Sequence, residues 1–386
     1  MNLVLRGGTK MFENLSLLQL QQYWWSIISL LGGLFVFMMF VQGGQTLLNT
    51  LSANETEKTM MVNSLGRKWE LGFTALVLFG GALFAAFPLF YSTSFGGAYW
   101  VWMAILFCFI IQAVSYEYRI KPNNFFGQKT YETFLYINGN MGVFLLGVAV
   151  STFFSGNEFI IDERNFSYWQ NDLRGLEALL NPFNYLLGFA LVFLSKILGA
   201  LYFINSIDHQ DIQNRAIDSI KFTMIAFLIF FLSFIIWILT KDGFAINENG
   251  SIYIQSFKYL LNFLDMPVIL GMFLSGVVMV ITAVYLTVHF NKSSCIKTGG
   301  AGTVLAVTAL LLNVGLNGTA YYPSTFDLQS SLTIMNSSGS HYTLMVMGYV
   351  SLMVPFVLGY IAYAWHQMNK TKITKEEIEA PDAHNY

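Results

Sequence analysis

Nine stretches of about 20 mostly apolar residues run along the chain, and each is long enough to cross a bilayer as a helix. They cover approximately residues 24–48, 72–91, 96–115, 134–154, 182–206, 220–240, 266–290, 300–321 and 344–366. Only 11% of the residues are charged, whereas a soluble domain carries about a quarter. The sequence therefore predicts an all-α polytopic membrane protein with about nine transmembrane helices.

The segments between these stretches are too short for a soluble domain, so we expect residues 1–386 to form a single integral membrane domain. Its first helical half would cover about 24–154, its second half about 182–366, and its tail 367–386. The loops on the tail side carry more Lys and Arg than the loops on the other side, which predicts a cytoplasmic C-terminus and an external N-terminus. The net charge of -2 excludes a nucleic-acid-binding protein.

Histidine and cysteine are scarce, which limits the metal and haem chemistry available to the chain. A haem in a helix bundle needs an inward-facing axial ligand such as His or Met. All five histidines lie at span ends, in loops or in the tail; they are His209, His289, His341, His366 and His384. With only two cysteines, Cys108 and Cys295, no thiolate metal site can form. We therefore expect this chain to ligate no haem and no metal.

A few polar residues at span ends are the candidate proton-pathway groups. They are Glu70 beside Trp69, Gln42 and Gln45 around a Gly-Gly pair, and Glu117 with Arg119. A carboxyl group half-sunk in apolar surroundings is harder to ionise, so it can exchange protons near neutral pH. The alternative is that Glu70 only stabilises a helix N-terminus and that Glu117 and Arg119 anchor the interface. Lys196 lies well inside a span, where snorkelling or an interhelical partner is the simpler interpretation.

Small residues in the second span predict close helix packing. They are Gly80, Gly81, Ala82, Ala85 and Ala86, and they are followed by Pro88, which we expect to kink the helix, as Pro355 would in the last span. The pair Gly43-Gly44 in the first span should act in the same way.

Several motifs, in order along about residues 24–380, resemble subunit II of cytochrome bd-type quinol oxidases. They are Trp24-Trp25, Asn63-Ser64-Leu65, Trp69-Glu70, the run Gly80-Gly81-Ala82-Leu83-Phe84-Ala85-Ala86-Phe87-Pro88, Tyr116-Glu117-Tyr118-Arg119, Leu180-Asn181-Pro182-Phe183, Pro323-Ser324-Thr325 and the tail segment Lys372–Ile378. The long run ending in Pro88 is the most specific of them.

The resemblance implies two four-helix bundles plus one peripheral helix, in a prokaryotic cytoplasmic membrane. It also implies a partner, subunit I, that holds two haems b and one haem d and oxidises quinol. This chain would scaffold that partner and help to deliver cytoplasmic protons for the reduction of dioxygen to water, which contributes to the proton motive force. The complex could also contain a structural quinone or lipid and a small accessory membrane subunit.

The chain departs from the family at the end of its first span. Relatives commonly carry an Asp-Gly-Phe-Asp type segment where this chain has Met39-Phe40-Val41-Gln42, so an amide stands where the second Asp would be. An amide cannot titrate, although it can hold a water chain. The rival functions are a multi-helix permease, for which convergent polar groups near the midplane would be expected, and a purely structural scaffold.

Overall fold

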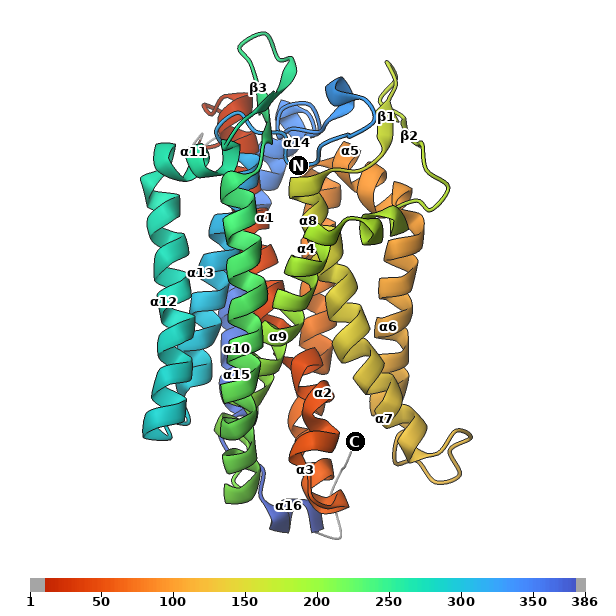
Figure 1. Cartoon of the computed structure of the whole chain (residues 1–386), viewed down its shortest axis with the longest axis vertical. Coiled ribbons are helices and arrows are strands. Elements are labelled where there is room, and N and C mark those ends of the chain that lie inside the picture. The colour runs from red at the N-terminus through yellow and green to blue at the C-terminus, as the bar shows by residue number, and fades with distance from the viewer. Residues whose placement is uncertain (1–10, 380–386) are drawn as a thin grey trace, which may run out of the picture.

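The computed structural model describes residues 11–379, and nine of its helical segments are long and apolar enough to cross a membrane. All nine predicted spans are confirmed (Figure 1). In chain order they are α1 and α2 (Leu17–Met38, Phe40–Leu51), α3 and α4 (Glu55–Gly66, Trp69–Ala86), α6 (Tyr99–Tyr118), α7, the π-helix η2 and α8 (Gln128–Ile137, Asn138–Gly142, Val143–Ser155), α9 (Pro182–Ser206), α10 (Gln210–Thr240), α12 (Pro267–Phe290), α13 (Cys295–Gly315), and α14 and α15 (His341–Ser351, Val354–Met368).

Some helices begin where a polar side chain caps the first turn, outside the apolar stretch. Ser16 forms a capping box with Gln19 at the start of α1, and the Asn54 side chain accepts the Glu57 N–H at the start of α3. The second span was predicted from residue 72, but its helical segment begins at Glu55 because α3 continues it in polar sequence. The length of the apolar stretch thus predicts where the chain crosses the membrane, but it does not predict where the helix begins and ends.

The two prolines expected to kink their spans interrupt them. Helix α4 ends at Ala86, and Pro88 starts the short helix α5 (Pro88–Tyr91), which continues into the π-helix η1 (Ser92–Gly97). Pro355 lies in the first turn of α15, just after the break that separates α15 from α14. Proline fits a first helical turn because its missing N–H would have no partner there.

The two ends of the bundle differ in structure. The end drawn uppermost in Figure 1 carries two antiparallel hairpins and short helical turns. They are β1 and β2 (Phe159–Ile161, Ser167–Trp169), η3 (Leu176–Leu180), β3 and β4 (Gly243–Ile246, Ile252–Gln255), α11 (Lys258–Asp265) and η4 (Leu328–Ser330). The opposite end, called the lower end below, carries α3, the start of α7 and the tail helix α16 (Lys375–Glu379).

Helix α9 forms the centre of the packing, in contact with α2, α8, α10 and α13. A Cβ added to Gly43 on α2 would lie 1.8 Å from the backbone oxygen of Ser195 on α9, so only glycine permits this approach. The same holds where α8 meets α9, because a Cβ added to Gly147 would lie 2.7 Å from the Cα of Gly188. Helix α15 contributes no buried residue and is therefore peripheral in the chain. The grouping into two four-helix bundles stays a prediction.

Candidate functional site

A column of buried amide side chains lies between α2 and α6. The Gln42 Nε2 donates to Gln112 Oε1 at 3.0 Å, and about one turn below, the Gln45 Nε2 donates to the Tyr116 hydroxyl at 3.2 Å. All four side chains are buried. The indole of Trp69 stacks on Tyr116 with ring centroids 5.6 Å apart and planes 10° from parallel, which closes the column on the side of α4.

The π-helix η2 brings a fourth amide next to this column. Asn138, its first residue, is fully buried, and Gly139 fits so closely that an added Cβ would lie 2.4 Å from the backbone oxygen of Gln42. A π-helical turn shifts the side chains that follow by one position and occurs frequently at functional sites. Here it widens the fourth span where it faces Gln42.

Several polar atoms of the column have no hydrogen-bond partner within the described residues. They are Gln45 Oε1, Gln112 Nε2 and both side-chain amide atoms of Asn138. A buried polar atom without a partner costs about 1–3 kcal/mol, and buried water commonly satisfies such atoms. The column is thus a set of neutral groups suited to holding water inside the bundle.

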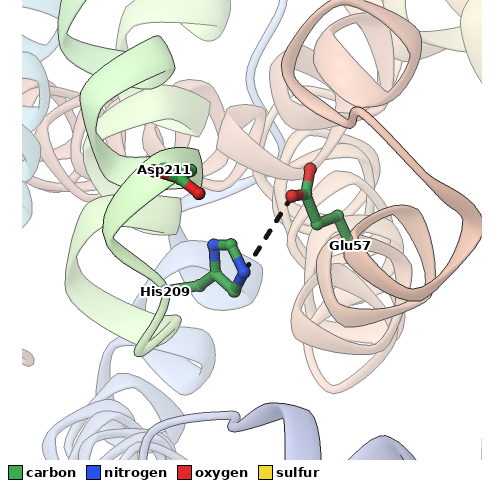
Figure 2. Close-up of side chains that lie close together, drawn as sticks. All are labelled: Glu57, His209 and Asp211. Atoms are coloured by element: carbon green, nitrogen blue, oxygen red, sulfur yellow. Dashed lines mark ion pairs between the residues drawn. The ribbon is translucent and has the colours of Figure 1, made fainter.

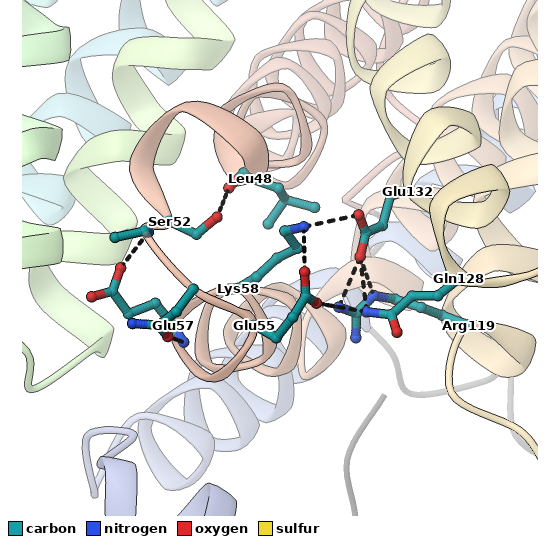
Figure 3. Close-up of polar contacts among 10 residues, drawn as sticks. Leu48, Ser52, Glu55, Glu57, Lys58, Arg119, Gln128 and Glu132 are labelled. Carbon is teal, nitrogen blue, oxygen red and sulfur yellow. Dashed lines mark hydrogen bonds and ion pairs between the residues drawn. The ribbon is translucent and has the colours of Figure 1, made fainter.

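Below the column lies a network of charged groups, shown in Figure 3. The fully buried Arg119 donates through Nε and Nη2 to Glu132 Oε1 at 3.1 and 2.9 Å, and Lys58 Nζ donates to Glu132 Oε2 at 3.1 Å. The exposed Glu55 lies 3.0 Å from Lys58 Nζ and 3.7 Å from Arg119 Nη2. A cavity of about 320 Å³ at the lower end is lined by Glu55, Gln128 and Glu132. The charges are therefore paired with one another and in contact with the lower surface.

The structure brings together only some of the predicted pathway residues. Gln42, Gln45 and Trp69 meet in the column, and Arg119 lies one turn below Tyr116 on α6. Glu70 and Glu117 are exposed and lie outside both the column and the network. Glu70 does occupy the first turn of α4, as the helix-dipole alternative requires.

Sequence reasoning missed Gln112, Asn138, Lys58 and Glu132. Gln112 carried a usable signal, because it is a strongly polar residue in the middle of an apolar span. Asn138 carried the same signal, because it lies inside the predicted span 134–154, but nothing local predicts the π-helix that begins there. Lys58 and Glu132 lie outside the predicted apolar stretches.

The small residues of the second span pack less closely within this chain than expected. Gly80 is buried, but an added Cβ would make only ordinary contact with the Phe95 ring at 3.6 Å, and Gly81 has nothing within 4 Å. Ala86 is fully buried, whereas Ala82 and Ala85 are half-buried. Gly43 makes the close approach that was predicted for it.

The remaining singled-out residues have simple surroundings. Lys196 is half-buried, and its Nζ lies 5.6 Å from the centre of the Phe193 ring. His341 is within 2.9 Å of the Leu15 carbonyl oxygen near the upper end, and His289 and His366 lie in last helical turns. His384 lies outside the described residues. Cys108 and Cys295 are buried free thiols.

Taken together, these features define a multi-span helical membrane protein in which a neutral polar column continues inward from a charged end. Residues 20–368 match the family described as "Cytochrome bd terminal oxidase subunit II", and the chain belongs to that family. The chain is thus related to subunits of a haem-containing quinol oxidase, an oxidoreductase that includes a subunit I partner.

Individual relatives match over nearly their whole lengths. The "Cytochrome bd-I ubiquinol oxidase subunit 2" of Escherichia coli K12 is 27% identical over 92% of this chain and 96% of its own. The "Cytochrome bd ubiquinol oxidase subunit 2" of Bacillus subtilis is 25% identical over 93% of this chain and 98% of its own. A chain of the bd oxidase structure from Geobacillus thermodenitrificans is similar with a TM-score of 0.53 and 12% identity, covering 91% of this chain and 96% of that one. That likeness shows the fold.

Proposed function

We propose that this chain is the haem-free subunit II of a prokaryotic quinol:oxygen oxidoreductase, which scaffolds the haem-bearing subunit I and helps to deliver cytoplasmic protons for dioxygen reduction. Family membership supports the oxidase over the permease alternative. The observation that carries the proton-delivery role is the buried, incompletely hydrogen-bonded amide column above the charged network.

The column suits water better than it suits a dry core. Arg119 and Gln112 are seven residues apart on α6, so the polar groups extend roughly 10 Å inward from the charged network. Amides cannot carry a net proton, but they can donate to and accept from a file of waters that does. We propose that this file lets protons reach the interior of the bundle from the lower end.

The lower end is the cytoplasmic end in this proposal. It carries the tail helix α16, the Glu132 network and Lys370, Lys372 and Lys375, in keeping with the bias of Lys and Arg towards cytoplasmic loops. The external end then carries the two hairpins. Quinol protons would leave on that side, and consumed protons would come from the other, so turnover would contribute to the proton motive force.

Haem ligation fits the partner and not this chain. The four described histidines lie at helix ends or in loops and not in the middle of a span, which supports this assignment. We therefore assign two haems b and one haem d, and the oxidation of quinol, to subunit I. A structural quinone or lipid and a small accessory subunit are further components that the family suggests.

Glu70 belongs to the partner contact in this proposal. It is exposed on α4 of the single chain, on a helix whose opposite side meets Gln42 through Gly72. Ionisable side chains within membrane-spanning helices rarely face lipid and usually face protein or water. We propose that subunit I covers Glu70, which would accept protons at the junction of the two subunits.

A pair of asparagine variants tests the column. Leucine has the same branched side-chain skeleton as asparagine, although its methyl groups are bulkier. Asn138→Leu therefore removes two buried unsatisfied atoms, which should offset the cost of the larger groups and keep the thermal stability of the complex close to that of the unmodified complex. If Asn138 holds water for proton delivery, the turnover of the assembled oxidase should nevertheless fall about tenfold, equivalent to roughly 1.4 kcal/mol of barrier. Asn140→Leu, two residues along the same π-helix, is the matched control, since Asn140 donates to the Tyr136 carbonyl outside the column.

Oxygen consumption with an artificial quinol, together with pH-indicator measurement of proton uptake in one turnover, reads out both variants. Unchanged turnover and uptake in Asn138→Leu would reject proton delivery through the column.

In parallel, Glu70→Gln should lower turnover about tenfold with haem content unchanged, and Glu70→Asp should retain much of the activity. A fully active Glu70→Gln oxidase between pH 6 and 8 would leave Glu70 as a helix-capping acid.

A further inference from the structure

A second cluster of ionisable side chains lies at the lower end, on the other side of α3 from the Glu132 network. Glu57 on α3 faces His209, which precedes α10, and Asp211 in the first turn of α10 (Figure 2). One ligand atom from each of the three residues lies within 4.8 Å of the others. The cluster therefore joins two spans that are far apart in sequence.

The hydrogen bonds of Glu57 leave one of its oxygens facing this cluster. Glu57 is buried, and its Oε2 accepts the Ala53 N–H at 2.7 Å and a guanidinium N–H of Arg215. Arg215 is itself held by donating through Nε to the Leu51 carbonyl oxygen at 2.6 Å. Oε1 accepts no hydrogen bond within residues 11–379 and lies 3.9 Å from His209 Nε2. That distance is too long for a hydrogen bond.

His209 and Asp211 have the freedom to complete a site. The Nδ1 of His209 is buried without a hydrogen-bond partner among the described residues, so no contact there fixes which ring nitrogen carries the proton. Asp211 is exposed and can turn towards the other two residues. In the view of Figure 2 the imidazole lies below the two carboxylates, with Nε2 on the side of Glu57.

We propose that Glu57, His209 and Asp211 bind a divalent transition-metal ion of the zinc class. An imidazole nitrogen with two carboxylate oxygens is a donor set typical of zinc, and the ion sits about 2.0–2.2 Å from each. Two atoms 3.9 Å apart can therefore share one ion with little movement. Arg215 neutralises one of the two carboxylates, which leaves a net negative site for a dication and keeps Glu57 oriented.

The position of the site gives the ion a structural consequence. Its ligands join α3 to the turn between α9 and α10, and the tail binds beside that turn through the Asp208 N–H and the Ile373 carbonyl at 2.9 Å. The tail also meets α3 through an ion pair between Arg67 and Glu377. A bound ion would therefore clamp the first two spans, the α9–α10 turn and the tail into one unit at the lower end.

Zinc binding to the purified, chelator-treated oxidase complex tests this assignment. We expect the complex to bind one equivalent of Zn²⁺ with a dissociation constant of about 1 μM. His209→Ala should abolish this binding, and Asp211→Asn should raise the dissociation constant about tenfold. His289→Ala is the matched control, because His289 also lies at the lower end of a span but near the Tyr285 carbonyl oxygen. Equilibrium dialysis counts the bound metal, and the zinc X-ray absorption edge identifies nitrogen and oxygen ligands.

The comparison does not depend on catalysis or on the proton column. Neither His209 nor Asp211 packs in the core, so both variants should assemble; His209→Gln gives a second variant that keeps a polar side chain. The assignment is overturned if His209→Ala and His289→Ala bind as much Zn²⁺ as the unmodified complex. It is also overturned if the X-ray absorption spectrum of the Zn²⁺ bound to the unmodified complex shows no histidine nitrogen ligand.

Discussion

Replacing Glu132 by Gln is the most demanding test of the charged network below the amide column. Glu132 is the carboxylate to which Arg119 and Lys58 both donate, and both it and Arg119 are shielded from solvent. Removing one partner of a buried ion pair costs about 3–5 kcal/mol, because the other charge stays buried. The glutamine oxygen can still accept a hydrogen bond from Arg119, and a Glu55 carboxylate oxygen lies 3.7 Å from Arg119 Nη2. The expected loss of stability is therefore smaller, about 2–3 kcal/mol.

The corresponding change in melting temperature follows from the size of the chain. With an unfolding entropy of roughly 2 cal/mol/K per residue, a loss of 2–3 kcal/mol over 386 residues lowers Tm by roughly 3 °C. Glu55→Gln is the matched control, since it makes the same change beside the same two cations, but its side chain is 68% exposed. A surface pair is worth at most about 1 kcal/mol, so the control should shift Tm by roughly 1 °C or less.

Thermal unfolding of the assembled complex can be followed with a thiol-reactive dye, because Cys108 and Cys295 are buried and free until the chain opens. The reasoning fails if the two variants are destabilised equally, since burial would then not set the strength of the network. It also fails if Glu132→Gln melts at the unmodified temperature. In that case the charges of Arg119 and Lys58 would be compensated elsewhere.

Three further outcomes can be checked. Gly43→Ala should destabilise the complex by about 1–3 kcal/mol, because the new methyl group would overlap the Ser195 backbone oxygen. Gly271→Ala is the control, since a Cβ there meets nothing within 4 Å, and the melting temperatures of the two variants decide this. Burial raises the pKa of Glu177, so the folded chain binds its proton more tightly than the unfolded chain, and stability falls as pH rises above the usual glutamate range. Glu177→Gln should therefore raise Tm at pH 7.5, and the gain should shrink towards pH of about 4.3; a gain that grows in acid contradicts the sign. A periplasm-active reporter fused after Tyr386 should be silent and one inserted near Ser338 active; the reverse pattern would place the lower end outside.

The sequence predicted the nine spans because membrane crossing depends on a one-dimensional property, the length of an apolar stretch. It could not predict the contact of Gln42 with Gln112, because the two residues are 70 positions apart and the packing of the whole bundle decides which faces of α2 and α6 meet. The sequence drew attention to Arg119 as a charged residue at the end of a span. Its burial, however, depends on Glu132, which begins a different span and gave no signal of its own.

The separation of charged from neutral polar groups constrains how this subunit could move protons. Glu132 accepts hydrogen bonds from Arg119, Lys58 and Gln128, so its oxygens are already occupied by three donors and this network orders the lower end. The column above it has unsatisfied atoms, but none of its side chains named above is a carboxylic acid. Any carrier that loads and releases protons must then lie beside the column and not within it. On this chain Glu70 meets that condition, because α4 places Trp69 against Tyr116 while Glu70 faces outward, where a partner subunit can cover it.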